Sequence, residues 1–187
     1  MNRSSILVEG IGLKGMKYPS SVYKIELREY RIWKGMLRRC TTKCSDIHTS
    51  YIGTTCSDNF KFYEYFHEWC QEQVGFNNID DGGKRWHLDK DLLLKGNKIY
   101  SEDTCVFIPQ RINKLLTKSN SSRGIYPLGV SYHKLIKMFS AGGHNGEKTV
   151  HLGYYHCQKE AFQSYKAHKE AIIKQVAAKY KHQLDTR

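Results

Sequence analysis

The sequence predicts an α+β protein, and three observations support this class. Apolar side chains recur at helical spacing in residues 26–40 and 60–69, and again in a long stretch at 158–180. Short β-type runs, bounded by glycine, asparagine and proline, lie within residues 86–108 and 129–153. Helices therefore precede a first pair of strands, and a second group of strands precedes the last helix. Such segregation of helices and strands is typical of α+β folds.

The composition indicates a folded protein that binds nucleic acid. The chain has 187 residues, a net charge of +12 and an isoelectric point of about 9.4. A length of this order suits one domain or two small ones. The positive charge is spread along the chain, which is the electrostatic pattern of a nucleic-acid binder, although a merely basic protein remains the alternative. Thirteen tyrosines argue against a disordered polycation.

The N-terminal segment does not have the pattern of a signal peptide. Four polar residues, 2–5, precede an apolar run of only three, residues 6–8. No stretch approaches the length of a transmembrane helix. We expect a cytoplasmic protein in a reducing compartment (the host cytoplasm if the chain is phage-encoded), monomeric and without a membrane partner.

The cysteines do not form a strong metal motif. Cys40, Cys44 and Cys56, with the nearby His48, are the best candidates for zinc, but the chain contains no CxxC pair. Buried free thiols are the favoured interpretation. We therefore expect no structural zinc ion.

The first predicted helix, residues 26–40, combines an apolar face with many cations. Its basic side chains are Arg28, Arg31, Lys34, Arg38 and Arg39. One interpretation is a helix that lies along DNA phosphates, chiefly through Arg38 and Arg39. The other is an ordinary amphipathic helix with a solvated basic face.

The next segment is predicted to be a loop followed by an aromatic helix. Residues 41–55 are polar, and residues 56–58 offer helix caps. Phe62, Tyr63, Phe66 and Trp69 then form a stripe at helical spacing, which indicates core packing more than a platform for bases.

The stretch from residue 86 to 116 has the pattern strand, loop, strand and helix. A turn is expected at residues 95–97, and Pro109 ends the second strand because proline has no N–H to donate. Helical spacing follows from residue 110 to 116. Such an arrangement can hold a carboxylate and an amide around one divalent ion.

Asp89 on the first strand and Asn113 on the helix are the candidate ligands. Both supply oxygen, which is the donor that hard cations such as Mg²⁺ prefer. The sequence thus predicts one Mg²⁺ or Mn²⁺ ion in this core.

These residues resemble the ββα-metal core of phage-type H-N-H homing endonucleases. The resemblance covers about residues 29–116 and is carried by Leu88-Asp89-Lys90, by Tyr100-Ser101-Glu102-Asp103-Thr104-Cys105 and by Asn113. It implies that Asp89 and Asn113 bind the metal. Two positions depart from the family pattern, because Lys90 stands where the general-base histidine belongs and Thr104 where the middle asparagine belongs. Lys90, His87 or a neighbouring acid such as Asp91 are then the remaining candidates for catalytic roles beside the metal.

A basic, serine-rich linker is expected at residues 117–125, between a nuclease-like domain at 1–116 and a second domain at 126–187. Lys118 and Arg123 within it are placed to contact phosphates. The second domain is predicted to form strands at residues 129–133, 137–141 and 148–153, with a turn at 142–146, followed by the helix at 158–180. These elements make a three-stranded antiparallel sheet backed by one helix.

This second domain resembles the AP2 DNA-binding domain. The shared pattern consists of Gly129-Val130, Phe139-Ser140-Ala141, Leu152-Gly153-Tyr154-Tyr155 and Glu160-Ala161-Phe162-Gln163-Ser164-Tyr165. The resemblance implies a sheet face that lies in the major groove of duplex DNA, which admits a β-ribbon. The outward positions are then expected to be Ser131, His133, Lys134, Lys137, Phe139, Lys148 and His151. Leu128 replaces the arginine usual before Gly-Val, so phosphate contacts should outnumber base contacts.

Together the two resemblances imply a metal-dependent endonuclease that hydrolyses double-stranded DNA. The alternative is an inactive nuclease fold that binds DNA, acting as a phage regulator or through a host protein. Lys90 and Thr104 favour that alternative.

Overall fold

The computed structural model describes residues 6–116, 124–146 and 148–184, and the chain divides into two compact units. The first unit comprises the chain up to Gln110 together with Leu184, and the second runs from Arg111 to Gln183. Helices and small antiparallel sheets occur in both, so the predicted α+β class is confirmed. Most of the predicted linker, residues 117–123, lies outside the described residues.

The first unit is built from short strands and helices. In chain order its elements are β1 (Ile6–Val8), β2 (Gly12–Lys14), β3 (Ser21–Val22), β4 (Ile25–Glu26), α1 (Arg28–Arg39), α2 (Thr42–Ile47), the 3₁₀ helix η1 (Thr49–Tyr51), β5 (Thr55–Cys56), the 3₁₀ helix η2 (Asn59–Lys61), α3 (Tyr63–Glu72), β6 (His87–Asp89), β7 (Ile99–Tyr100) and β8 (Val106–Ile108). The strands pair as β1–β2, β3–β4, β5–β7 and β6–β8, and only β5–β7 among these described pairs is parallel.

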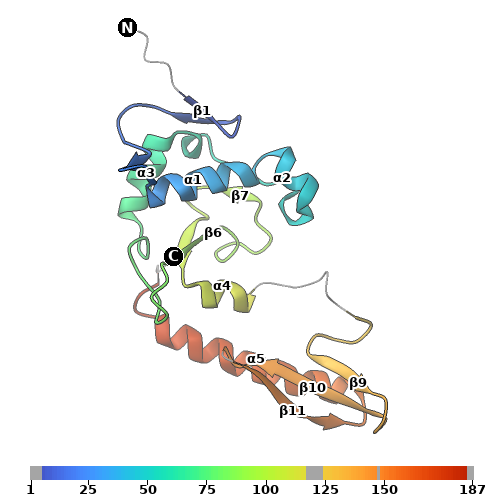
Figure 1. The fold of residues 1–187 in the computed structure, drawn as a ribbon. Helices are drawn as coiled ribbons and strands as arrows, with labels where there is room; N and C mark the ends of the chain where they lie inside the picture. Colours follow the sequence, from blue (N-terminus) through green and yellow to red (C-terminus); the bar gives the residue numbers. More distant parts are fainter. Residues whose placement is uncertain (1–5, 117–123, 147, 185–187) are drawn as a thin grey trace. The chain divides into compact units, whose positions relative to one another are not determined.

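Helices α1 and α3 pack side by side and enclose the core of the first unit (Figure 1). From α1, Trp33, Met36 and Leu37 are fully buried, as the helical spacing predicts. The indole N–H of Trp33 donates to the carbonyl of Phe60 at 2.7 Å. A buried indole needs such a partner, so this bond fixes the orientation of α1 against η2.

The cations of α1 are not all available to a ligand, contrary to one interpretation of the sequence. The Arg28 guanidinium turns inward, donates to the carbonyls of Phe76 and Trp86 (2.7 Å to Trp86) and stacks 4.4 Å from the Phe76 ring centroid. Lys34 is paired with Glu26. Arginine is suited to this role because its planar group can both stack and donate several hydrogen bonds.

The segment predicted as a loop, residues 41–55, contains the helix α2 and the 3₁₀ helix η1, so this prediction was wrong. Cys44 is buried there, and β5 closes the segment by pairing with β7. Cys44 and Thr54, the buried residues described in this segment, are not at helical spacing, so the sequence pattern resembles a loop.

The aromatic helix is confirmed as a core element, with one correction. Tyr63, Phe66 and Trp69 are buried on α3, whereas Phe62 precedes the helix and is 47% exposed. The polar cluster at residues 56–58 supplies no side-chain cap to α3, because η2 intervenes.

The second predicted core region has the expected order of strands and helix. β6 pairs with β8 in antiparallel register, with His87 opposite Ile108 and Asp89 opposite Val106. α4 (Gln110–Leu116) follows after Pro109. All three residues of β8 are buried, so this strand anchors β6 to the core.

The second unit is a three-stranded antiparallel sheet with a long helix along one face (Figure 1). Its strands β9 (Val130–His133), β10 (Met138–His144) and β11 (Thr149–Tyr155) lie in the order β11–β10–β9, and α5 (Gln158–Tyr180) follows. The predicted strands and helix are present here. β10, however, continues through Gly142 and Gly143, where a turn was expected.

Close packing against α5 explains two glycines of the second unit. A Cβ on Gly143 would lie 2.4 Å from the His168 ring, and one on Gly129 would lie 2.1 Å from the Tyr165 ring. Ala141 between them is fully buried. Side chains of α5 therefore pack directly against the backbone at Gly129 and Gly143.

Candidate metal site and nucleic-acid interface

Asp89 ends β6 and starts the turn that follows it. Its Oδ1 accepts the backbone N–H groups of Asp91 and Leu92, both at 2.8 Å. This is the local turn that aspartate favours. A carboxylate has about four lone-pair sites, so two amide bonds at one oxygen leave acceptor capacity for a cation.

Lys90 points to the other side of the strand and is only 7% exposed. Its Nζ donates to Asp91 Oδ1 and to the carbonyl of Asn97, both at 2.6 Å, and lies 5.7 Å from the Tyr100 ring centroid. The ammonium is therefore held within the loop by charge-assisted hydrogen bonds, which are stronger than neutral ones. In this arrangement Lys90 donates hydrogen bonds that organise the loop.

Asn97 is an organising residue that the sequence pattern did not single out as part of the site. It is 8% exposed, and its Nδ2 donates to the carbonyls of Lys90 at 2.8 Å and Ile99 at 2.6 Å. Its Oδ1 accepts the Ile99 N–H at 3.0 Å. The side chain thus closes the loop between β6 and β7. The turn signal at Gly96-Asn97 was the available clue, although it indicated only a turn.

Thr104 completes a second small network beside this loop. Its hydroxyl donates to the carbonyl of Ile99 at 2.8 Å and lies 2.9 Å from the hydroxyl of Ser101. The backbone N–H of Cys105 donates to the carbonyl of Ser101 at 2.9 Å. Thr104 therefore fixes the approach to β8.

Cys105 is fully buried next to these residues. Burial raises the pKa of its thiol to about 12, the charge of Asp89 raises it further and that of Lys90 opposes this. The thiol is thus neutral at physiological pH.

His87 and Asn113 are the other two predicted site residues. His87 is exposed, and it shares a face of β6 with Asp89 because alternate strand residues point the same way. Asn113 is half-buried on α4, which the second compact unit contains from Arg111 onward. The two predicted metal ligands, Asp89 and Asn113, therefore belong to different compact units.

The predicted pair of ligands, Asp89 and Asn113, would suit a hard cation that takes few protein ligands. Mg²⁺ is often held by one or two protein oxygens, with water and phosphate oxygens completing the shell. One carboxylate and one amide suit that pattern. Among the residues that the structure describes, no cluster of three or more His, Cys, Asp or Glu side chains is arranged to hold a metal.

The residues considered for zinc differ in burial and contacts. Cys40 and Cys56 hydrogen-bond to each other, Cys44 is buried, and His48 is exposed. The hydrogen bond from Cys40 and the charge of Lys61 lower the pKa of Cys56, although burial opposes them. All six cysteines are free thiols in the structure.

The outer face of the sheet in the second unit carries a cluster of polar and aromatic side chains. His151 Nδ1 lies 3.3 Å from Ser140 Oγ, and the His151 ring lies 4.6 Å from the Tyr154 ring. His133 meets Tyr154 edge-on at 5.8 Å. These four residues come from all three strands and form a surface with hydrogen-bonding and stacking capacity.

Phe139 does not belong to this face, which corrects the expectation from the sequence. It lies two residues before the buried Ala141 and therefore has the same orientation, toward the helix side. Its ring packs against Tyr126 and Tyr132, with centroids 5.6 and 5.1 Å apart.

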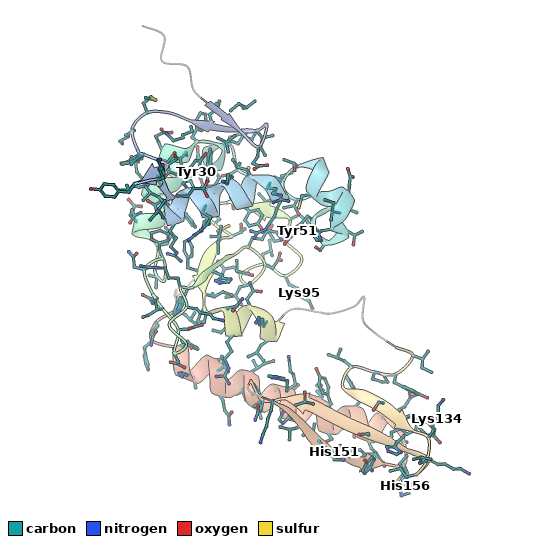
Figure 2. The ribbon with its side chains drawn as sticks, in the orientation of Figure 1. Tyr30, Tyr51, Lys95, Lys134, His151 and His156 are labelled. Carbon is teal, nitrogen blue, oxygen red and sulfur yellow. The ribbon has the colours of Figure 1, made fainter. Side chains whose placement is uncertain are left out.

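The predicted cationic residues of the second unit lie at both ends of the sheet. Lys134 and Lys137 are exposed in the β9–β10 turn, and Lys148 is exposed before β11 (Figure 2 labels Lys134 and His151). At that second end Arg111 donates to the carbonyl of Asn145 at 3.3 Å. The turns thus frame the polar face with positive charge.

The remaining predicted DNA contacts differ in availability. Arg38 is exposed on α1, whereas Arg39 is half-buried and lies 5.9 Å from the Tyr51 ring centroid. Lys118 and Arg123 lie outside the described residues.

None of the described helices combines the length and apolarity that crossing a membrane requires.

Comparisons with known proteins give no family assignment. No protein-family model matches the chain, and neither curated proteins nor solved structures give a significant match. Inference about function therefore rests on the residues themselves.

Proposed function

We propose that the chain is a metal-dependent endonuclease that nicks double-stranded DNA, with the second unit as its DNA anchor. The observation that carries the proposal is the order β6, loop, β8, α4, with Asp89 at the end of the first strand and Asn113 on the helix. A pair of antiparallel strands followed by a helix is the order that the sequence resemblance to a ββα-metal core implies. The net charge of +12 supports a polyanionic substrate.

In this proposal Asp89 would bind one Mg²⁺ or Mn²⁺ ion, and Asn113 is the second ligand that the sequence resemblance implies. When bound, such an ion stabilises the charge that develops on the scissile phosphate. Oδ1 of Asp89 is oriented by the two turn amides, which keep the carboxylate at the end of the strand. Orientation of a ligand by neighbouring hydrogen bonds is the usual support of a metal site.

His87 is the side chain best suited to accept a proton from the attacking water. It is exposed and shares the face of Asp89, and imidazole is the most common general base in enzymes. Asp91 suits the role less because its carboxylate is bonded to the Lys90 ammonium. Lys90 donates hydrogen bonds within its loop and so helps to hold the site residues in position.

The proposed DNA anchor is the outer face of the sheet. His133, Ser140, His151 and Tyr154 supply side chains that can contact bases or sugars, and the lysines at the turns supply phosphate contacts. We expect binding that depends strongly on salt, because the lysines at the turns contact phosphates. We expect it to depend weakly on sequence, because the central cluster of four residues contains no arginine or lysine to read base edges.

A DNA-binding protein without nuclease activity is the second candidate. The observation that favours it is Lys90, whose Nζ is committed to Asp91 and Asn97 at the position where the family places its base. In that case the β6–β8 core would serve only as a scaffold.

Nicking of supercoiled DNA tests these candidates. The protein is incubated with Mg²⁺, with Mn²⁺ or with a chelator, beside Asp89→Asn, which keeps the oxygen that accepts the turn amides but loses the charge. Asp46→Asn, an exposed position on α2, is the matched control. Metal-dependent nicking that is lost only in Asp89→Asn supports the nuclease, and His87→Gln should then slow it. DNA binding without nicking in any condition favours the second candidate.

The DNA anchor is tested separately through its salt dependence. A Lys134→Gln/Lys137→Gln variant should reduce the slope of log affinity against log salt by up to about 2, since each phosphate contact contributes roughly 0.9. Lys174→Gln, exposed on α5, is the control and should leave the slope unchanged. Equal slopes in all three proteins would remove the sheet turns from the interface.

A further inference from the structure

The turn between β9 and β10 exposes two large aliphatic side chains. This hairpin tip consists of residues 134–137, in which Leu135 is 89% and Ile136 is 46% exposed. Lys134 and Lys137 flank them and are also exposed. Hairpin turns are normally built from glycine, asparagine or aspartate, none of which is present here.

The backbone of the hairpin tip is held in one conformation. Lys137 has a positive φ of 52°, a region that lysine seldom adopts. The flanking register is regular, with His133 opposite Met138 and Tyr132 opposite Phe139. The two aliphatic side chains are therefore displayed by an ordered hairpin and not by an open loop.

The hairpin tip adjoins the polar face proposed to contact DNA. Because Phe139 pairs with both Tyr132 and Tyr155, the end of β11 and His156 lie at the same end of the sheet as the hairpin tip, where Figure 2 labels Lys134 and His156. An apolar protrusion thus continues a surface of histidine, tyrosine and serine and is flanked by two ammonium groups.

We propose that the hairpin tip is a wedge that enters a base step of duplex DNA. Leu135 and Ile136 would insert between two stacked base pairs and unstack that step, while Lys134 and Lys137 contact the phosphates on either side. Aliphatic side chains of minor-groove proteins act in this way and bend the duplex. The inference rests on the proposed DNA binding and adds to it a local distortion of the DNA.

Charge complementarity selects DNA over other occupants of this apolar surface. A second copy of the chain would bring the same pair of lysines to the contact, and like charges oppose such an approach. A DNA duplex offers both the phosphates for the lysines and an apolar interior between stacked bases. Pyrimidine–purine steps, which unstack most readily, should be the preferred points of entry.

The test uses duplexes in which 2-aminopurine, whose fluorescence rises on unstacking, is placed within or beside a TA step. Binding of the full chain is followed by anisotropy, and unstacking by 2-aminopurine fluorescence, both with a chelator present to prevent cleavage. The variant is Leu135→Gln/Ile136→Gln, which keeps the size and solubility of the hairpin tip. Ile125→Gln is the matched control, because Ile125 is also 89% exposed in the second unit but lies outside the hairpin tip.

The unmodified protein and Ile125→Gln should raise the fluorescence on binding. The hairpin variant should lose that rise while it keeps DNA binding and the same salt slope. Binding with no fluorescence rise in the unmodified protein, at TA or any other step, would overturn the wedge but leave the proposed DNA binding intact. No binding at all would remove the proposed function as well. Binding to anionic vesicles or dimerisation, if either is abolished by the hairpin variant while fluorescence on DNA is unchanged, would assign the tip to that partner and overturn the wedge.

Discussion

Replacing Asn97 by alanine should destabilise the first unit strongly, although the residue lies in a loop. The amide makes three hydrogen bonds within a buried site, two to the carbonyls of Lys90 and Ile99 and one from the Ile99 N–H. Asn97→Ala removes all three and leaves the Ile99 N–H and the Lys90 carbonyl without this partner. The Ile99 carbonyl keeps its bond from Thr104.

The size of the effect follows from these bonds. A typical intramolecular hydrogen bond contributes about 1 kcal/mol net, and a buried group left without a partner costs about 1–3 kcal/mol. A loss of roughly 3 kcal/mol is therefore expected, which is a large part of the 5–15 kcal/mol typical of a native protein. With a urea m-value of about 2 kcal/mol/M, the midpoint should fall by about 1.5 M.

Tryptophan fluorescence provides the assay, because Trp33, Trp69 and Trp86 all lie in the first unit. Urea unfolding followed by this signal reports that unit without interference from the sheet of the second. Asn77→Ala, at an exposed position of the same unit, is the control and should change the midpoint little. If Asn97→Ala shifted the midpoint no more than Asn77→Ala, the three hydrogen bonds would not organise the loop as argued here.

Three further predictions concern single side chains. Because the Cys105 pKa is raised to about 12 from an ordinary value of 9.0, unfolding releases its proton between these limits. Its stabilising contribution is complete below pH 9 and falls by about 1.4 kcal/mol per pH unit above it, and Cys105→Ala should flatten that part of the urea stability profile against pH. Gly129→Ala should cost at least about 2 kcal/mol, since φ is +76° and the Cβ would meet Tyr165, whereas Gly124→Ala should be neutral in the same thermal unfolding measurement. Arg28→Ala should cost about 3 kcal/mol in urea unfolding through its lost carbonyl bonds and ring contact, whereas exposed Arg38→Ala should stay within about 0.5 kcal/mol.

The second unit was the part of the fold most accessible from sequence. Its strands are bounded by glycine and asparagine turns in the sequence, and the helix after Cys157 runs for 23 residues without glycine or proline. A long stretch without residues that break helices is a clear local signal. The error at Gly142 and Gly143 has a specific cause, because glycine there serves close packing against His168, while in the sequence it resembles turn chemistry.

The first unit was less accessible because its organising contacts join distant residues and leave no periodicity. Arg28 reaches the carbonyls of Phe76 and Trp86, 48 and 58 residues away, yet in the sequence it resembles any surface cation of an amphipathic helix. α2 has six residues and could not be distinguished from a polar loop. Propensity is a weak guide wherever tertiary hydrogen bonds decide the outcome.

The contacts of Lys90 bear directly on the choice between the two proposed functions. Its Nζ donates to the carboxylate of Asp91 and to a backbone carbonyl, so both acceptors require the nitrogen to carry hydrogen. A base at this position would have to break bonds that hold the loop together. The candidate site can therefore be catalytic only if a proton acceptor lies elsewhere, and His87 shares the face of β6 with Asp89. If His87 does not fill that role, the hydrogen bonds of Asp89 and Lys90 order a scaffold for DNA binding and not a catalytic site.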